Sequence, residues 1–114
     1  MNDNITLGQI AHSRSGDKGN HANIAVLAYT QAGFDWIRQH LTIQLVARHF
    51  AGLGASRVER FEAANVWGLN FMLYDALGGG ASRSLRVDTQ GKALGQAILS
   101  LRLPLPGNLS EMLQ

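Results

Sequence analysis

The chain contains no cysteine, only two prolines and no long apolar run. Without cysteine, disulfide bonds and thiolate metal sites are excluded. No apolar stretch approaches the roughly 20 residues that a membrane-spanning helix needs. The polar first residues, Met1 to Asn4, do not resemble a secretory signal. We therefore expect a cytoplasmic protein that has no membrane contact.

An excess of charge of one sign is also lacking. Ten basic side chains are mixed with eight acidic ones, which leaves a formal net charge of +2, and no run of Lys or Arg occurs. Proteins that bind nucleic acid usually cluster their cations, so no nucleic-acid partner is predicted. With 114 residues, of which 46% are hydrophobic and 16% charged, the composition favours a single globular domain over residues 1–114.

The pattern of apolar residues predicts an alternation of strands and helices. Alternation predicts a strand over 5–10, and a continuous apolar run predicts a buried strand over 23–29. These two strands are expected to pair as a hairpin around a long polar loop. Helical spacing predicts two helices between 30 and 50, capped by Thr30 and Thr42 and followed by glycines at 52 and 54.

The second half of the chain continues in the same way. Strands are expected over 56–62 and 84–88. Residues 67–74 fit either a strand or a helix, and their aromatic and branched content favours a strand. An amphipathic helix over 92–101 and an extended segment from Leu103 follow. Long parallel crossovers are absent, so the order of elements predicts the α+β class, an antiparallel sheet with helices packed on one face.

The most informative stretch is the polar segment from His12 to Asn23, which we interpret as a loop. Backbone N–H groups of a glycine-rich turn can form a nest that binds phosphate or carboxylate. Arg14 can clamp such an anion with two hydrogen bonds, and Lys18 adds a compact charge. Asp17 would orient a cation or act as a base. The alternative is a loop folded on itself, in which Asp17 accepts backbone N–H groups.

Two further groups of residues are weaker candidates for ligand binding. The run Gly78–Gly80 with Arg83 and Ser84 offers flexible backbone donors beside a cation, and on residue types alone it is equally a plain connection. Asn70 lies in an apolar run, where a buried amide commonly satisfies a neighbouring backbone group.

The histidines do not indicate a metal site. His12 and His21 can approach each other across the expected loop, but neither they nor His40 and His49 have metal-ligand spacing with a carboxylate in register. We predict no metal and no cofactor.

Several motifs occur in an order that points to a family. They are Arg14-Ser15-Gly16-Asp17-Lys18-Gly19-Asn20, Ala22-Asn23-Ile24, Leu69-Asn70-Phe71, Ala76-Leu77-Gly78-Gly79-Gly80, and Ser84-Leu85-Arg86 with Asp88 and Gly91-Lys92. In this order the chain resembles, over about residues 5–103, the small C-terminal domain of AtuA-type proteins, the acyclic terpene utilisation family. The resemblance implies a ferredoxin-like fold.

The resemblance also implies a partner and a ligand class. In AtuA-type proteins this domain follows a large N-terminal domain, so a chain that holds the small domain alone is expected to bind a separate large AtuA-type chain. The family is linked to catabolism of branched or terpenoid acids handled as CoA thioesters. The implied ligand is a small organic acid or acyl-CoA.

Three functional hypotheses remain open at this point. The first is an enzyme subunit, with hydratase or hydro-lyase as its reaction class. The second is a non-catalytic assembly module, and the third is an independent homo-oligomer that binds small anions. The candidate catalytic residues are Arg14, Asp17 and Lys18. The candidate ligand-binding residues are Ser13, Arg14, Ser15, Gly16, Lys18, Gly19, Asn20, Asn23, Asn70, Gly78, Gly79, Gly80, Arg83 and Ser84.

Overall fold

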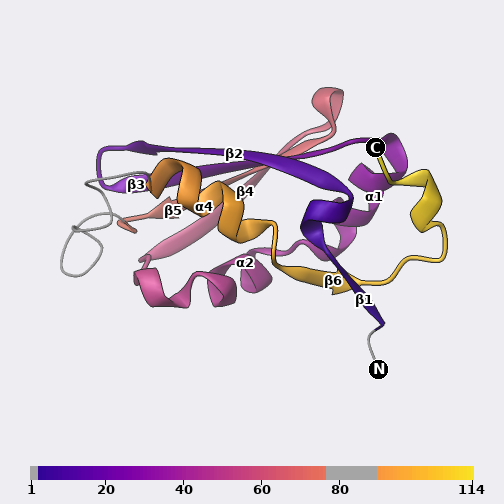
Figure 1. Ribbon diagram of the computed structural model, residues 1–114. Helices are drawn as coiled ribbons and strands as arrows, with labels where there is room; N and C mark the ends of the chain where they lie inside the picture. The colour runs from indigo at the N-terminus through magenta and orange to yellow at the C-terminus, as the bar shows by residue number, and fades with distance from the viewer. Residues whose placement is uncertain (1–2, 77–89) are drawn as a thin grey trace.

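A computed structural model describes residues 3–76 and 90–114 (Figure 1). Four antiparallel strands form the larger sheet in the order β2-β3-β5-β4. Their bounds are Ala11–Lys18 (β2), His21–Ala28 (β3), Gly68–Tyr74 (β5) and Arg57–Ala63 (β4). A second, two-stranded sheet pairs β1 (Asn4–Thr6) with β6 (Arg102–Pro104). The described helices are α1 (Gln31–His40), α2 (Ile43–His49) and α4 (Gln90–Ile98).

The core lies between one face of the larger sheet and the helices. Ile24 of β3 is opposite Phe71 of β5, and Val26 is opposite Leu69. These side chains are fully or almost fully buried. The buried helix residues Phe34, Ile37, Val46 and Ile98 belong to the same hydrophobic cluster. The arrangement confirms the α+β prediction of an antiparallel sheet with helices on one face.

The predicted helix starts are confirmed. The Thr30 Oγ1 accepts a hydrogen bond from the Gly33 N–H at 3.0 Å, and the Thr42 Oγ1 accepts one from the Leu45 N–H at 3.1 Å. Both threonines satisfy N–H groups that the first turn of a helix leaves unpaired. No helix in the described part of the chain has the length and apolarity needed to cross a bilayer.

The predicted strand over 5–10 is largely wrong. Only residues 4–6 form β1, and Leu7–Gln9 form a 3-10 turn, whose Gln9 side chain accepts a hydrogen bond from the Thr6 N–H at 3.0 Å. Ile5 is opposite Leu103 and not opposite the strand at 23–29. The true partner of β1 lies about a hundred residues away, and local alternation carries no information about it.

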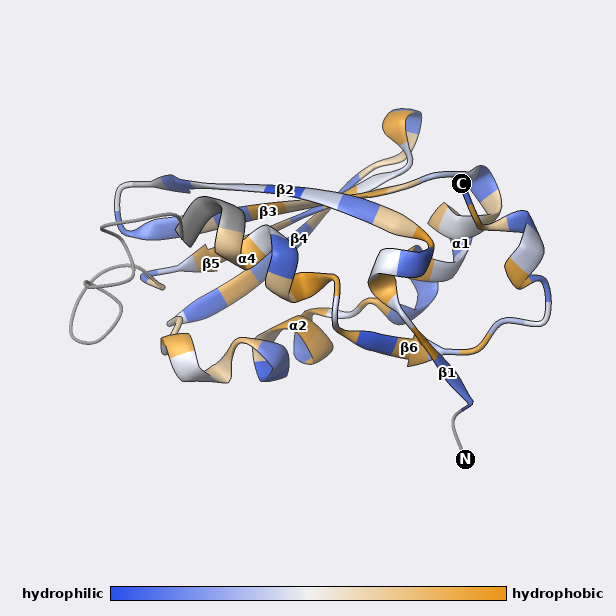
Figure 2. Ribbon diagram, in the orientation of Figure 1, coloured by the Kyte–Doolittle hydropathy of each residue, from blue (hydrophilic) through white to orange (hydrophobic). Residues whose placement is uncertain are grey.

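The predicted polar loop is also wrong, because most of it is strand. Eight pairs join β2 to β3 in unbroken register, from Ala11 opposite Ala28 to Lys18 opposite His21. Only Gly19 and Asn20 form the turn. Gly19 has a φ of +64°, which suits the first central position of a type II′ hairpin turn. The strand tolerates polar residues because it is at the edge of the sheet, and its hydrophilic character is visible in Figure 2.

In the second half of the chain, the observed elements agree better with the predicted ones. The strand predicted over 67–74 is β5, and Asp75 leaves it with a φ of +61°. The helix predicted over 92–101 is α4, shifted to residues 90–98. The strand expected over 84–88 and the candidate residues Gly78–Gly80, Arg83 and Ser84 lie outside the described residues.

Arg60 links β4 to the end of α1. Its Nη1 donates to the carbonyl oxygens of Leu41 at 2.9 Å and Arg38 at 3.0 Å, where helix carbonyls have no partner within the helix. We expect Arg60→Leu to lower the free energy of unfolding by about 1.5–3 kcal/mol in urea denaturation.

A matched control for this change is Arg57→Leu, on the same strand but on the opposite face, with its side chain 63% exposed. Its expected cost is below about 1 kcal/mol. Equal losses for the two variants would show that the carbonyl contacts of Arg60 contribute nothing to stability.

Candidate functional site

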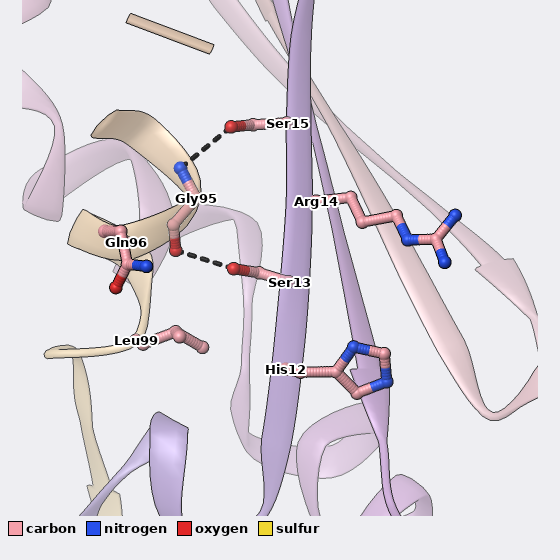
Figure 3. Close-up of a pocket in the computed structure, with 7 residues that line it drawn as sticks. All are labelled: His12, Ser13, Arg14, Ser15, Gly95, Gln96 and Leu99. Atoms are coloured by element: carbon pink, nitrogen blue, oxygen red, sulfur yellow. Dashed lines mark hydrogen bonds between the residues drawn. The ribbon is translucent and has the colours of Figure 1, made fainter. Parts of the chain in front are cut away.

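The polar residues from His12 to Lys18, which we call the signature segment, are divided between the two faces of β2. Successive side chains of a strand point to opposite faces. Ser13 and Ser15 are opposite the buried residues Val26 and Ile24 and therefore face the helices. Arg14 lies between them and points the other way, as does His12 (Figure 3).

On the helix side, the two serines hold α4 against the sheet. The Ser13 hydroxyl donates to the Gly95 carbonyl oxygen at 2.6 Å, and the Gly95 N–H donates to the Ser15 Oγ at 2.9 Å (Figure 3). A Cβ at position 95 would lie 3.0 Å from the Ser15 Oγ and 3.2 Å from the Ser13 Oγ. The close approach of α4 to β2 therefore requires glycine, and the hydroxyls are occupied by the helix backbone.

The backbone nest expected over Ser13 to Asn20 is not formed. A nest needs successive N–H groups that converge on one point. Residues 13–18 are extended and paired with β3, so their N–H groups alternate in direction. The strand register also places Asp17, opposite the buried Ala22, on the helix side of β2. Arg14 is on the other side, so any anion contact must come from side chains and not from a backbone cradle.

The other face of the sheet has no helix over it among the described residues, and we call it the open face. The pairing register places Arg14, Ala25, Asn70 and Phe61 in one row across its four strands. The neighbouring row contains Gly16, Asn23, Met72 and Glu59. The predicted site residues Arg14, Gly16, Asn23 and Asn70 are thus brought together here.

Asn23 and Asn70 form a pair on this face. The Asn23 Nδ2 donates to the Asn70 Oδ1 at 2.6 Å and lies 3.8 Å from the Met72 sulfur. Asn70 therefore does not serve a backbone group in the core, as an amide in an apolar run commonly does. The pair leaves the Asn23 Oδ1 and the Asn70 Nδ2 without a partner among the described residues, one acceptor and one donor on a half-buried surface.

Arg14 is the exposed cation of this group. It makes no ion pair with any described residue. Only the small Ala25 stands between Arg14 and Asn70 in the row, and the small Gly16 lies opposite Asn23. Short side chains at these two positions leave the guanidinium and the amide pair accessible from the same side.

A polar cluster at one end of the open face was missed by the sequence interpretation. The Tyr74 hydroxyl donates to the Glu59 Oε1 at 2.6 Å, and the Arg57 guanidinium lies 4.3 Å from the Tyr74 ring centroid. The His21 ring contacts Tyr74 edge-on at 5.1 Å, and its Nδ1 accepts the Asp75 N–H at 3.0 Å. Recognising Gly19-Asn20 as a two-residue turn would have placed His21 on this face.

The histidines lie apart. His12 stacks on Tyr29 at the far end of β2, with 5.4 Å between the ring centroids, whereas His21 lies beside the turn. The proposed approach of His12 to His21 is therefore wrong. Within residues 3–76 and 90–114, no three His, Asp or Glu side chains are grouped so that they could hold a metal ion.

An antiparallel sheet covered by helices on one face defines an α+β protein. The family of the AtuA ferredoxin-like domain matches residues 5–104, nearly the whole chain, and the protein belongs to this family. The match confirms the predicted resemblance and fold. The chain has no significant match among curated proteins or among solved structures.

Proposed function

We propose that the chain is a small subunit or module of an AtuA-type protein. In this proposal its open face binds a large AtuA-type chain, and an anionic acyl ligand is held between the two. The observation that carries the proposal is the gathering of Arg14, Asn23 and Asn70 on the face that no described helix covers.

The chemistry of these three side chains suits a carboxylate or thioester. Arg14 can form two parallel hydrogen bonds to a carboxylate or phosphate oxygen pair. The Asn70 Nδ2 can donate to an acyl carbonyl oxygen, and the Asn23 Oδ1 can accept from a hydroxyl or amide. This donor set fits branched or terpenoid acids and their CoA thioesters, and a hydration or dehydration step on such a ligand is the reaction class we propose.

A partner is part of the proposal for an electrostatic reason. Arg14 is exposed, and at that position water weakens its attraction for an anion to about 1 kcal/mol at contact distance. A large chain placed over the open face would exclude water and strengthen every polar contact to the ligand. Phe61, 49% exposed in the same row as Arg14, supplies an apolar contact for such a partner.

A second candidate function is a non-catalytic assembly module. It is supported by the exposed apolar side chains Val66, Trp67 and Phe61 on and beside β4 and β5, which are 50%, 36% and 49% exposed. Apolar anchors of this kind are typical of protein interfaces whether or not a ligand is bound.

The two functions separate when assembly and turnover are measured on the same variants. The protein is co-expressed with a large AtuA-type chain; size-exclusion chromatography reports the complex, and turnover of a branched acyl-CoA reports chemistry. We expect Arg14→Ala and Asn70→Ala to keep the complex and to lower turnover at least about tenfold, equivalent to roughly 1.4 kcal/mol. Phe61→Asp is expected to weaken the complex.

The control is Arg48→Ala, an exposed cation on α2 on the helix side of the sheet, which is expected to change neither readout. Loss of the complex in Arg14→Ala with unchanged residual turnover would favour the assembly module. Absence of any complex, with a small carboxylate bound by the chain alone, would favour a homo-oligomeric anion binder.

A further inference from the structure

The outer edge of β2 has an unsatisfied backbone. A two-residue turn is closed by a hydrogen-bonded pair, here Lys18 with His21, and such pairs alternate along antiparallel strands. His12, Arg14 and Gly16 therefore direct their N–H and C=O groups toward β3. Ser13 and Ser15 direct theirs outward, and no backbone group of a described residue pairs with them.

A pocket of about 460 Å³ lies along this edge. It is lined by the consecutive residues 12–15 of β2 and by Gly95, Gln96 and Leu99 of α4 and the turn that follows it. The side chains of residues 12–15 point to alternate faces of the strand (Figure 3). Four consecutive residues whose side chains alternate in direction can line the same pocket only if the pocket runs along the strand backbone. The pocket is therefore a channel between the strand edge and α4.

The width of the channel is set by the hydrogen bonds that hold α4 at a fixed distance from β2. The two hydrogen bonds between Gly95 and the serines attach the helix to the helix side of β2 and leave the edge itself uncovered by described residues. No proline or bulge interrupts β2, whose eight residues keep one-to-one register with β3. Proteins commonly protect exposed strand edges by such devices, and this strand has neither.

We propose that the channel between β2 and α4 binds an extended segment of a separate polypeptide, which adds to the sheet as a further antiparallel strand beside β2. The outward N–H and C=O groups of Ser13 and Ser15 bind its backbone. Small aliphatic side chains of the segment face Leu99 on the helix side, and an acidic side chain faces Arg14 on the open side. Strand addition of this kind supplies affinity from the backbone and specificity from alternate side chains.

Charge favours a separate acidic segment over a second copy of β2. In antiparallel pairs of two β2 edges centred on Ser13, on Arg14 or on Ser15, the Arg14 of one copy would lie across from His12, Arg14 or Gly16 of the other. These contacts add no attraction, and like charges directly opposite are destabilising. An acidic side chain at the same place pairs with a cation that has no ion-pair partner among described residues.

This inference concerns the strand edge and does not rest on the proposed ligand at the open face. The probe is the capped hexapeptide of alternating valine and glutamate, titrated into the full chain. NMR hydrogen exchange reports each amide of β2. In the free protein, the amides of Ser13 and Ser15 should exchange fast and that of Arg14 slowly. The peptide should protect Ser13 and Ser15 selectively.

Matched peptides and variants make the test specific. A valine–lysine peptide, and a valine–glutamate peptide N-methylated at the positions that face β2, should each bind at least about tenfold more weakly. Ser15→Pro removes the outward N–H at a strand edge, where proline is tolerated, and should abolish binding. Ser15→Ala loses the hydroxyl but keeps the N–H, and should bind the peptide.

The following outcomes would overturn the proposal. One is slow exchange of the Ser13 and Ser15 amides in the free monomer, which would show that the edge is already paired. Another is protection that depends on protein concentration and not on peptide, which would assign the edge to a second copy. Equal binding of the N-methylated peptide would show that the peptide binds through its charge and not through backbone pairing with β2. Ligand binding at Arg14 and Asn70 can fail without affecting any of these readouts.

Discussion

Replacing Gly95 by valine is expected to destabilise the protein by about 2–6 kcal/mol, measured by urea denaturation. The first added carbon would lie 3.0 and 3.2 Å from the hydroxyl oxygens of Ser15 and Ser13. Overpacking of this kind costs about 1–3 kcal/mol, and each of the two displaced hydrogen bonds adds about 0.5–1.5 kcal/mol. The helix propensity of valine exceeds that of glycine by only a few tenths of a kcal/mol and does not offset this loss.

The control is Gly107→Val, where an added Cβ meets no atom within 4 Å and the backbone is not left-handed. Its expected effect is within about 0.5 kcal/mol, as for most surface substitutions. A stable Gly95→Val variant with an unchanged β2 amide spectrum would contradict the attachment of α4 through the two serines.

Substitution by alanine should cost much more stability at one of two phenylalanines than at the other, because they lie on opposite faces of the sheet. Phe71→Ala removes a side chain with no exposure from the central strand β5, and the expected loss is about 3–5 kcal/mol. Phe61→Ala removes a side chain that is 49% exposed on the edge strand β4, and the expected loss is below about 1 kcal/mol. Thermal and urea unfolding of both variants measure the difference.

This pair tests which face of the sheet is covered. Equal large losses would mean that Phe61 is buried by a part of the molecule that packs on the open face of the monomer. The proposal that a large AtuA-type chain binds the open face would then fail. A small loss for Phe61→Ala would instead leave that side chain accessible to a partner.

Local patterns in the sequence predicted the elements whose causes are local. Thr30 and Thr42 cap helices through bonds to residues three positions later, and the continuous apolar run after Asn23 predicts the buried strand β3. The family resemblance was equally readable, because it depends on the order of motifs along the chain and not on contacts between them.

The error over residues 12–20 has a definite physical origin. A polar stretch favours a loop because strands are usually apolar on at least one face. Here the helix-side residues Ser13 and Ser15 satisfy their hydroxyls on the backbone of Gly95, 80 or more positions away in the sequence. A polar edge strand of this type cannot be distinguished from a loop until its distant partner is known.

The sequence by itself determined the class of fold, the helix caps and the family, since each follows from residue types at short or fixed spacing. Only the tertiary structure decided what the signature segment does. Strand alternation sends its serines to α4 and its arginine to the open face. The pairing of β2 with β3, and of β3 with β5, places Arg14 on the same face as Asn23 and Asn70. These contacts join residues far apart in the chain, so only the packed sheet brings them together.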